Sequence, residues 1–132
     1  MIKGSCLCGE VRYEYDGVIN EIALCHCKQC RKAQGVAFVT NTPVDSDKLT
    51  ILKGQTLLKS FRSAPNKERV FCSNCGSPIY SAKDEMPDVK RLRVGTIDTE
   101  FVCENQYHIY VDSKASWHEI TDKYPQYLTQ KS

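Results

Sequence analysis

Three cysteines on one short stretch are the residues of this chain best suited to chemistry. Cys25, Cys27 and Cys30 occur in the run Cys-His-Cys-Lys-Gln-Cys, where they are too close together to be structural disulfide partners of one another. Thiolates on one short turn instead suit a soft cation such as zinc, which takes four ligands in a tetrahedron. Three ligands leave one position open, and an open position distinguishes a catalytic zinc site from a closed structural one.

Four further cysteines form two pairs that complement each other. Cys6 and Cys8 make a CxC pair, while Cys72 and Cys75 make a CxxC pair followed by Gly76, a pattern typical of a zinc knuckle. In an extended backbone, residues i and i+2 point to the same side, so Cys6 and Cys8 can bind one ion together. Joining the two pairs closes a tetrahedral site and ties the N-terminal segment to the middle of the chain. Such a long-range connection is typical of a structural site.

The fourth ligand of the three-cysteine turn has two possible origins. Cys103 is left without a partner and could complete the site, or a histidine could do so, which would make it a second structural site. A water molecule or a substrate could instead occupy the fourth position. Spacing alone favours neither alternative.

Basic residues surround the three-cysteine turn. Lys28, Arg31 and Lys32 are either solvated charges that offset an anionic metal centre or contacts for a substrate carboxylate, which arginine can bind in a bidentate manner. His26 lies between two ligands and is expected to point away from the ion, with either a structural role or a role in proton transfer.

Short strands are the elements that must position these residues. Val11, Tyr13 and Tyr15 alternate with polar residues, which predicts a half-buried strand over 11–15. A single helical turn is expected over 31–34, ended by Gly35, and no segment shows sustained helical periodicity. We therefore predict a mainly β fold of short antiparallel strands with little helix, stapled by metal into a single domain over 1–132. Further strands are expected over 19–24, 36–42, 49–52, 57–61, 68–71, 78–80, 89–94 and 107–111.

Composition excludes several classes of protein. The formal net charge is only +2, without a run of like charges, so we expect neither nucleic-acid nor membrane binding. The N-terminal residues have no apolar signal region, so we expect a soluble, cytoplasmic protein. In that compartment clustered cysteines are metal ligands more often than disulfides.

Three sequence blocks resemble the signature of one enzyme family. GSCLCGEV at 4–11, CHCKQCRK at 25–32 and FCSNCGSPI at 71–79 are similar, in this order, to blocks of the glutathione-dependent formaldehyde-activating enzyme family, which also includes centromere protein V. Residues 94–98 and 108–117 resemble its C-terminal part. The resemblance implies a tent-like β fold with two zinc ions, one structural at Cys6, Cys8, Cys72 and Cys75, the other catalytic at Cys25, Cys27 and Cys30. Cys103 matches no position of these motifs.

The resemblance also implies an activity. Members of the family join glutathione to formaldehyde, which is carbon–sulfur lyase chemistry in the reverse direction, so the expected partners are a small thiol such as glutathione and an aldehyde. Zinc with three thiolates carries a formal charge of about −1, which favours exchange of soft ligands over activation of water. An incoming thiol could lose its proton on binding zinc, or zinc could polarise the carbonyl while the thiol attacks from outside. The alternative function is that of a non-catalytic, zinc-stabilised binding module, or of a domain that only buffers thiols or aldehydes.

Overall fold

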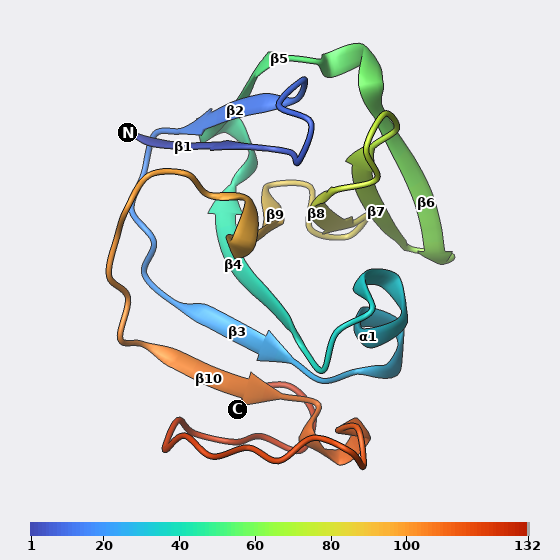
Figure 1. Cartoon of the computed structure of the whole chain (residues 1–132), viewed down its shortest axis with the longest axis vertical. Coiled ribbons are helices and arrows are strands. Elements are labelled where there is room, and N and C mark those ends of the chain that lie inside the picture. Colours follow the sequence, from blue (N-terminus) through green and yellow to red (C-terminus); the bar gives the residue numbers. More distant parts are fainter. Residues whose placement is uncertain (132) are drawn as a thin grey trace.

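The computed structural model describes residues 1–131 and places ten strands in two sheets, with one α-helix, in that part of the chain (Figure 1). The prediction of a mainly β fold with little helix is thereby confirmed. Short 3-10 turns connect several strands, at Ser46–Lys48, Gln55–Leu57, Val94–Thr96 and Val111–Ser113.

The smaller sheet is three-stranded and carries the N-terminal cysteine pair. Its order is β1 (Ile2–Ser5), β2 (Arg12–Tyr15) and β5 (Leu49–Lys53), with both pairings antiparallel. Tyr13 and Tyr15 on β2 are buried while Arg12 is exposed, as the alternation predicts. Strand β1 was not predicted, because Ile2–Ser5 has no alternating pattern.

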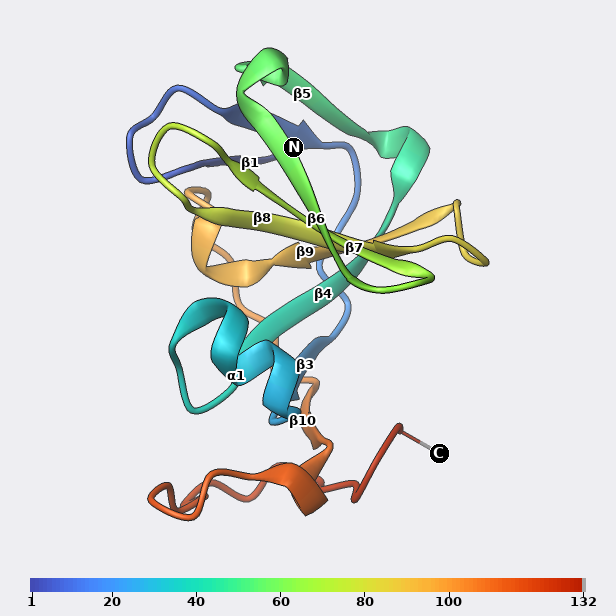
Figure 2. The same ribbon diagram turned by 90° about the vertical axis from the view of Figure 1, so that its right-hand side faces the viewer.

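The larger sheet is seven-stranded, and its two ends lie close to the two groups of cysteines. Neighbouring strands are antiparallel with one exception: β10 (Gln106–Ile109) runs parallel to β3 (Ile22–Cys25), and His108 is paired with Leu24. The parallel pairing brings a C-terminal segment beside the three-cysteine turn (Figures 1 and 2). The strand order is β10 (Gln106–Ile109), β3 (Ile22–Cys25), β4 (Val39–Asp45), β9 (Val89–Arg93), β8 (Pro78–Lys83), β7 (Lys67–Cys72) and β6 (Leu58–Ala64).

The single α-helix, α1 (Lys28–Gln34), begins inside the cysteine run. The amide of Cys30 donates to the Sγ atom of Cys27, which caps the helix N-terminus, and Gly35 ends the helix with φ 65°. The predicted helical turn at 31–34 therefore starts three residues earlier, because a cysteine side chain supplies the cap. Among residues 1–131, no helix is both long and apolar enough to cross a membrane.

The described part of the chain has two apolar cores, and each contains cysteines of one group. One core contains Val11, Tyr13 and Leu92 with the buried Cys6 and Cys72. The other contains Cys25 and Cys30 together with Ala23, Val39, Tyr107 and Ile109. Each group of cysteines is thus anchored in its own core, which limits how far its sulfur atoms can move.

Candidate metal centres and active-site pocket

The two cysteine pairs come together as one cluster of four, here called the closed cluster (Cys6, Cys8, Cys72 and Cys75). Their four sulfur atoms all lie within 4.8 Å of one another. The Sγ atom of Cys8 is 3.5 Å from that of Cys6 and 3.9 Å from that of Cys72. A zinc ion with four bonds of about 2.3 Å in a tetrahedron places its sulfurs about 3.8 Å apart. The separations therefore fit ligands around an ion, whereas a disulfide needs about 2 Å.

Two tight turns deliver these ligands. The Cys6–Cys8 pair lies on a turn after β1 rather than on extended backbone, and the turn brings both sulfurs to one side. At the end of β7, Gly76 adopts φ 81° and its amide donates to the carbonyl of Cys72. Glycine adopts this left-handed conformation without the steric cost that a side chain would bring.

Neutral donors surround the closed cluster. The amide of Val11 donates to Cys6 Sγ over 3.3 Å, and the side-chain amide of Asn74 donates to Cys8 Sγ over 3.3 Å. The hydrogen bond between Cys75 and the hydroxyl of Ser77 lowers the pKa of Cys75 to about 5. These donors stabilise thiolates without placing a charged side chain against them.

The remaining three cysteines form the open cluster (Cys25, Cys27 and Cys30). Cys25 ends β3, Cys27 caps α1 and Cys30 lies in the first turn of α1, so the strand-to-helix junction assembles all three. The Sγ atoms of Cys25 and Cys30 are 3.4 Å apart, close to the separation around a zinc ion. Among residues 1–131, no further cysteine, histidine, aspartate or glutamate completes this group. Cys103 lies elsewhere, with its thiol directed to the carbonyl of Asn105.

Two buried arginines lie beside the open cluster. Arg69 on β7 places Nη2 3.8 Å from Cys30 Sγ, and Arg93 on β9 donates through Nη1 to the side-chain oxygen of Asn41 and through Nε to that of Gln34. The exposed fractions of Arg69 and Arg93 are 9% and 4%. Neither forms a salt bridge to an aspartate or glutamate within the described part of the chain.

The cysteines are the anionic groups that these arginines can pair with. Hydrogen bonds from Cys25 and Cys27 lower the pKa of Cys30, and the charge of Arg69 lowers it further. Burial lowers the pKa of Arg93 to about 10, an effect that the nearby Cys30 and Cys25 oppose. Because a buried charge is costly unless it is paired, the two guanidinium groups indicate that the open cluster is anionic.

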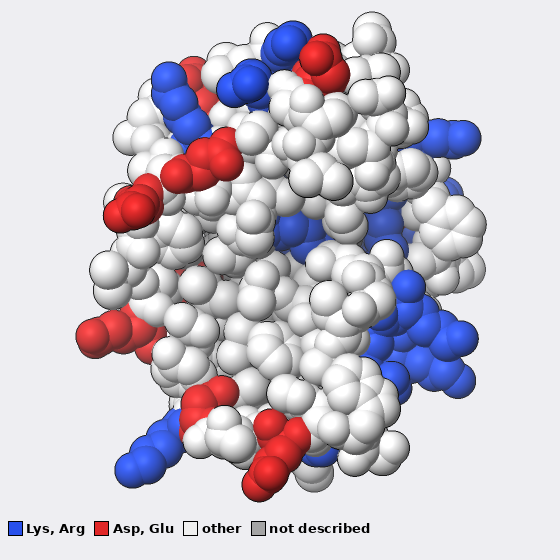
Figure 3. All heavy atoms as spheres, in the orientation of Figure 1, with Lys and Arg blue, Asp and Glu red and all other residues white. Residues whose placement is uncertain are grey.

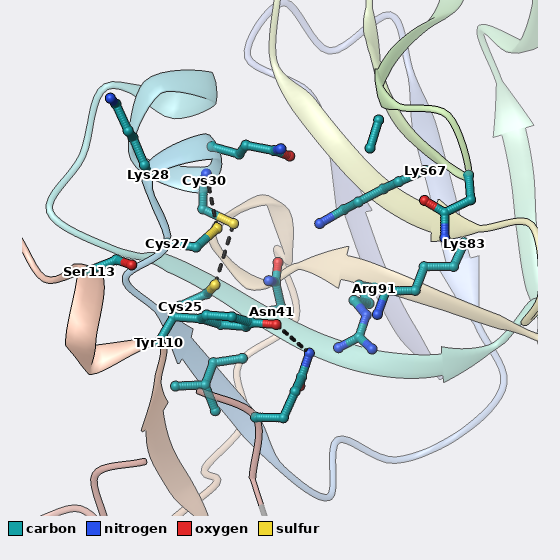
Figure 4. A pocket seen from close by; sticks show the side chains of 15 residues that line it. Cys25, Cys27, Lys28, Cys30, Asn41, Lys67, Lys83, Arg91, Tyr110 and Ser113 are labelled. Carbon is teal, nitrogen blue, oxygen red and sulfur yellow. Dashed lines mark hydrogen bonds between the residues drawn. The ribbon is translucent and has the colours of Figure 1, made fainter. Parts of the chain in front are cut away.

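A cavity of about 420 Å³ opens in front of the open cluster (Figure 4). The three cysteines form one wall, and Lys67, Lys83 and Arg91 reach in from the other side (Figure 4). In the orientation of Figure 1, Lys and Arg atoms gather on the side of the molecule where α1 lies, without Asp or Glu atoms among them (Figure 3). The remaining lining residues are Lys28, Gln29, Asn41, Ala64, Asn66, Ile109, Tyr110, Ser113 and Gln130.

The basic residues expected at the turn have different locations. Lys28 lines the cavity. Arg31 does not, because its guanidinium donates to the carbonyl of Ser113. Lys32 borders a separate hollow of about 290 Å³ behind α1, which Arg69 also lines. Sequence reasoning missed Lys67, Lys83 and Arg91, which belong to no motif and meet only through strand pairing.

Tyr110 is the aromatic residue of the cavity wall. It is the one residue other than glycine with a positive φ in the described chain, at 56°, a conformation that is uncommon for a bulky side chain. Its hydroxyl accepts a hydrogen bond of 2.8 Å from Gln130. The structure thus holds a phenol in the cavity, within the space that the cysteines border.

His26 is buried away from the cavity. Its Nε2 atom lies 2.7 Å from Nδ1 of His108, whose Nε2 atom lies 3.0 Å from each carboxylate oxygen of Asp122. Burial is the main cause that lowers the pKa of His26 to about 4. Of the two roles considered for His26, these contacts favour the structural one, since they connect the cysteine turn to the C-terminal segment.

Fold and site together define a mainly β protein with a four-cysteine and a three-cysteine cluster that could each hold a metal ion, the second facing a basic cavity. The family described as "Glutathione-dependent formaldehyde-activating enzyme" matches residues 1–113, and this chain belongs to that family.

Individual relatives agree with this assignment. A Halomonas elongata protein that carries the same enzyme name is 27% identical over 93% of this chain and 83% of its own length. A Schizosaccharomyces pombe protein named as a lyase is 31% identical over 61% of this chain and 56% of its own length. A crystal structure of a Rhodobacter sphaeroides protein, 20% identical, matches with a TM-score of 0.62 over 75% of this chain and 90% of that one, which shows a shared fold.

Proposed function

We propose that this protein is a zinc-dependent enzyme that joins a thiol to an aldehyde and, in the reverse direction, acts as a carbon–sulfur lyase. Glutathione and formaldehyde are the first pair to consider, because the family and the Halomonas elongata relative are named for them. The name of the Schizosaccharomyces pombe relative supports lyase chemistry.

The proposal assigns one zinc ion to each cluster. The closed cluster has four thiolates and no position for a substrate, so its ion is structural. The open cluster supplies three thiolates and faces the cavity, so its ion can take a fourth ligand from a substrate. Bound there, zinc would supply a site at which a thiol loses its proton and is held as a thiolate.

Charge balance is the observation that carries the proposal. Three thiolates on zinc give a formal charge of about −1, and a fourth thiolate makes it about −2. Arg69 and Arg93 place two buried positive charges beside this centre, and neither has a carboxylate partner in the described chain. The surroundings therefore match a thiolate as the fourth ligand, whereas neutral water would leave one buried positive charge unmatched.

The chain's own residues then account for the remaining requirements of the addition. The sulfur lone pair forms a bond to the aldehyde carbon, and the carbonyl π electrons move to the oxygen, which must receive a proton. The hydroxyl of Tyr110 lines the cavity and can donate that proton, and the proton released by the thiol restores the phenol. No proton is gained or lost overall, and the reverse sequence splits the adduct.

NMR exchange spectroscopy with thiols and aldehydes tests the proposed activity. In the wild-type protein, adduct formation from glutathione and formaldehyde should be faster than in buffer, and Cys27→Ser should abolish the acceleration. Cys103→Ser is the matched control, because its thiol lies outside both clusters, and it should retain the full rate. Exchange no faster than in buffer for every thiol–aldehyde pair would overturn the proposal and favour a binding module.

A further inference from the structure

Three basic side chains on adjacent strands share one wall of the cavity. Lys67 on β7 is paired in register with Lys83 on β8, and Arg91 on the next strand, β9, is paired with Ser81 of β8. Figure 4 shows the three side chains running from this wall toward the space in front of the cysteines. All three are half-buried, so they are held by the sheet rather than free in solvent.

These three groups have no anionic partner within the described residues. None of them forms a salt bridge or a side-chain hydrogen bond there, and no aspartate or glutamate lines the cavity. In the described part of the chain, the lysines and arginines with a carboxylate partner are Lys48, Lys53 and Arg62, which are exposed and lie outside the cavity. Burial, together with the charge of Arg69, lowers the pKa of Lys67. Like charges held together in a half-buried wall repel one another unless an anion binds between them.

We propose that Lys67, Lys83 and Arg91 form a subsite for a carboxylate of the thiol substrate, which they bind while its sulfur occupies the open cluster. The inference rests on the proposed function, because it takes the carboxylate to belong to the thiol. The substrate would then be a thiol that carries a carboxylate some distance from its sulfur, and glutathione is an example. Neutral thiols such as 2-mercaptoethanol would be poor substrates.

The cavity has the dimensions and chemistry for such a ligand. Its volume of about 420 Å³ lies within the range of small-molecule sites. The planar guanidinium of Arg91 can bind a carboxylate through two parallel hydrogen bonds, and the two lysines add point charges beside it. Sulfur and carboxylate would then be held at opposite walls, which fixes the thiolate for attack on an aldehyde.

Calorimetry with a ligand that has no thiol separates this subsite from the metal chemistry. The probes are S-methylglutathione and its diethyl ester, each titrated into the zinc-loaded protein. The acid should bind at least about tenfold more tightly than the diester, and this preference should weaken as salt is added. In Lys83→Gln and in the double variant Lys67→Gln/Arg91→Gln the preference should fall to about twofold or less. Lys59→Gln, a change at an exposed lysine of β6, should leave it unaltered.

The outcomes distinguish the two proposals. Equal binding of acid and diester by the wild-type protein, or an unchanged preference in the variants, would overturn the subsite even if thiol–aldehyde exchange is catalysed. A preference that depends on these residues, in a protein that accelerates no exchange, would uphold the subsite and refute the enzyme. Acetate is a further probe. If acetate binds as tightly as S-methylglutathione does, the three basic residues bind any small anion, and the assignment to the thiol substrate is wrong. The zinc content of each variant, measured beforehand, shows that the fold is retained.

Discussion

The closed and open clusters use the same ligand atom but differ in what surrounds it. Around the closed cluster, a backbone amide, a side-chain amide and a hydroxyl contact the sulfurs of four cysteines. Around the open cluster, two buried arginines lie beside three cysteines. Neutral donors suit a centre whose charge never changes, whereas buried cations suit a centre that gains a negative ligand during its reaction. This difference in surroundings supports the proposed division into a structural and a reactive site.

The clusters also differ in what they hold together. The closed cluster joins the turn after β1 to the turn after β7, and so connects the smaller sheet to the larger one. The open cluster is local, since all its ligands lie between the end of β3 and the first turn of α1. Removing a ligand from the first should therefore affect the whole fold, while removing one from the second should affect one turn.

Ligand substitutions should give the largest contrast. Cys72→Ser is expected to prevent folding, because binding of a structural zinc contributes about 10–16 kcal/mol, as much as the whole stability of a typical domain. Cys27→Ser should lose one of two zinc ions and keep a cooperative unfolding transition. Metal analysis together with circular dichroism measures both effects, with Cys103→Ser as the control. If the two variants unfold alike, the division into structural and reactive centres is wrong.

Arg69 allows a sharper test of the electrostatic difference. Arg69→Gln removes one buried positive charge beside the open cluster, so the dissociation constant for a thiol should rise about ten- to hundredfold. Thiol binding can be followed by the sulfur-to-metal absorption of the cobalt-substituted protein. Arg62→Gln, which removes an exposed arginine paired with Asp84, should have no such effect. Loss of metal from the open cluster alone would support the same role for Arg69, and an unchanged dissociation constant with full metal content would contradict it.

A series of side-chain contacts from His26 through His108 to Asp122 supports the turn of the open cluster, and the closed cluster has no such series among the described residues. His108→Ala leaves the Nε2 atom of His26 buried without its partner and opens a small cavity, so the free energy of unfolding should fall by about 2–3 kcal/mol. Denaturant unfolding in excess zinc measures this change. His118→Ala is the control, because that ring lies near His26 without a hydrogen bond to it, and its effect should be smaller. Equal effects would mean that packing, and not the hydrogen bond, supports the turn.

The sequence predicts the cysteine ligands far better than the residues around them, because the ligands form local patterns and their surroundings come from distant parts of the chain. CxC and CxxC pairs are local patterns, as are the alternation at Tyr13 and Tyr15 and the glycine that ends α1, and each of these is visible without knowing the fold. The arginines and lysines near the open cluster come from β7, β8 and β9. The sequences of these strands are typical of half-exposed strands, and the arginines and lysines belong to no motif that marks a site. Alternation shows which side chains share a face, but not that this face meets a turn some forty residues away, as Arg69 meets Cys30.

The same limit explains the errors in the elements. The parallel pairing of β10 with β3 depends on contacts between distant segments, so a set of antiparallel strands was the simpler expectation. Helix α1 begins at Lys28 because Cys27 accepts the capping hydrogen bond, a role that cysteine seldom takes. The single domain over 1–132 and the two zinc ions stay predictions that metal analysis and unfolding experiments can test.

Asn74 provides the smallest and most specific test of the comparison. Its side-chain amide donates to Cys8 Sγ at an exposed position, so Asn74→Ala should lower the stability of the closed cluster by about 1 kcal/mol or less. Zinc should then be removed from that cluster by a chelator a few times faster, while the thiol affinity of the open cluster stays the same. Asn105→Ala, which removes a side-chain hydrogen bond to the carbonyl of Asn20, is the matched control. A change in thiol affinity would show that the two centres are coupled, and the distinction between a neutral structural shell and a cationic reactive one would then have to be abandoned.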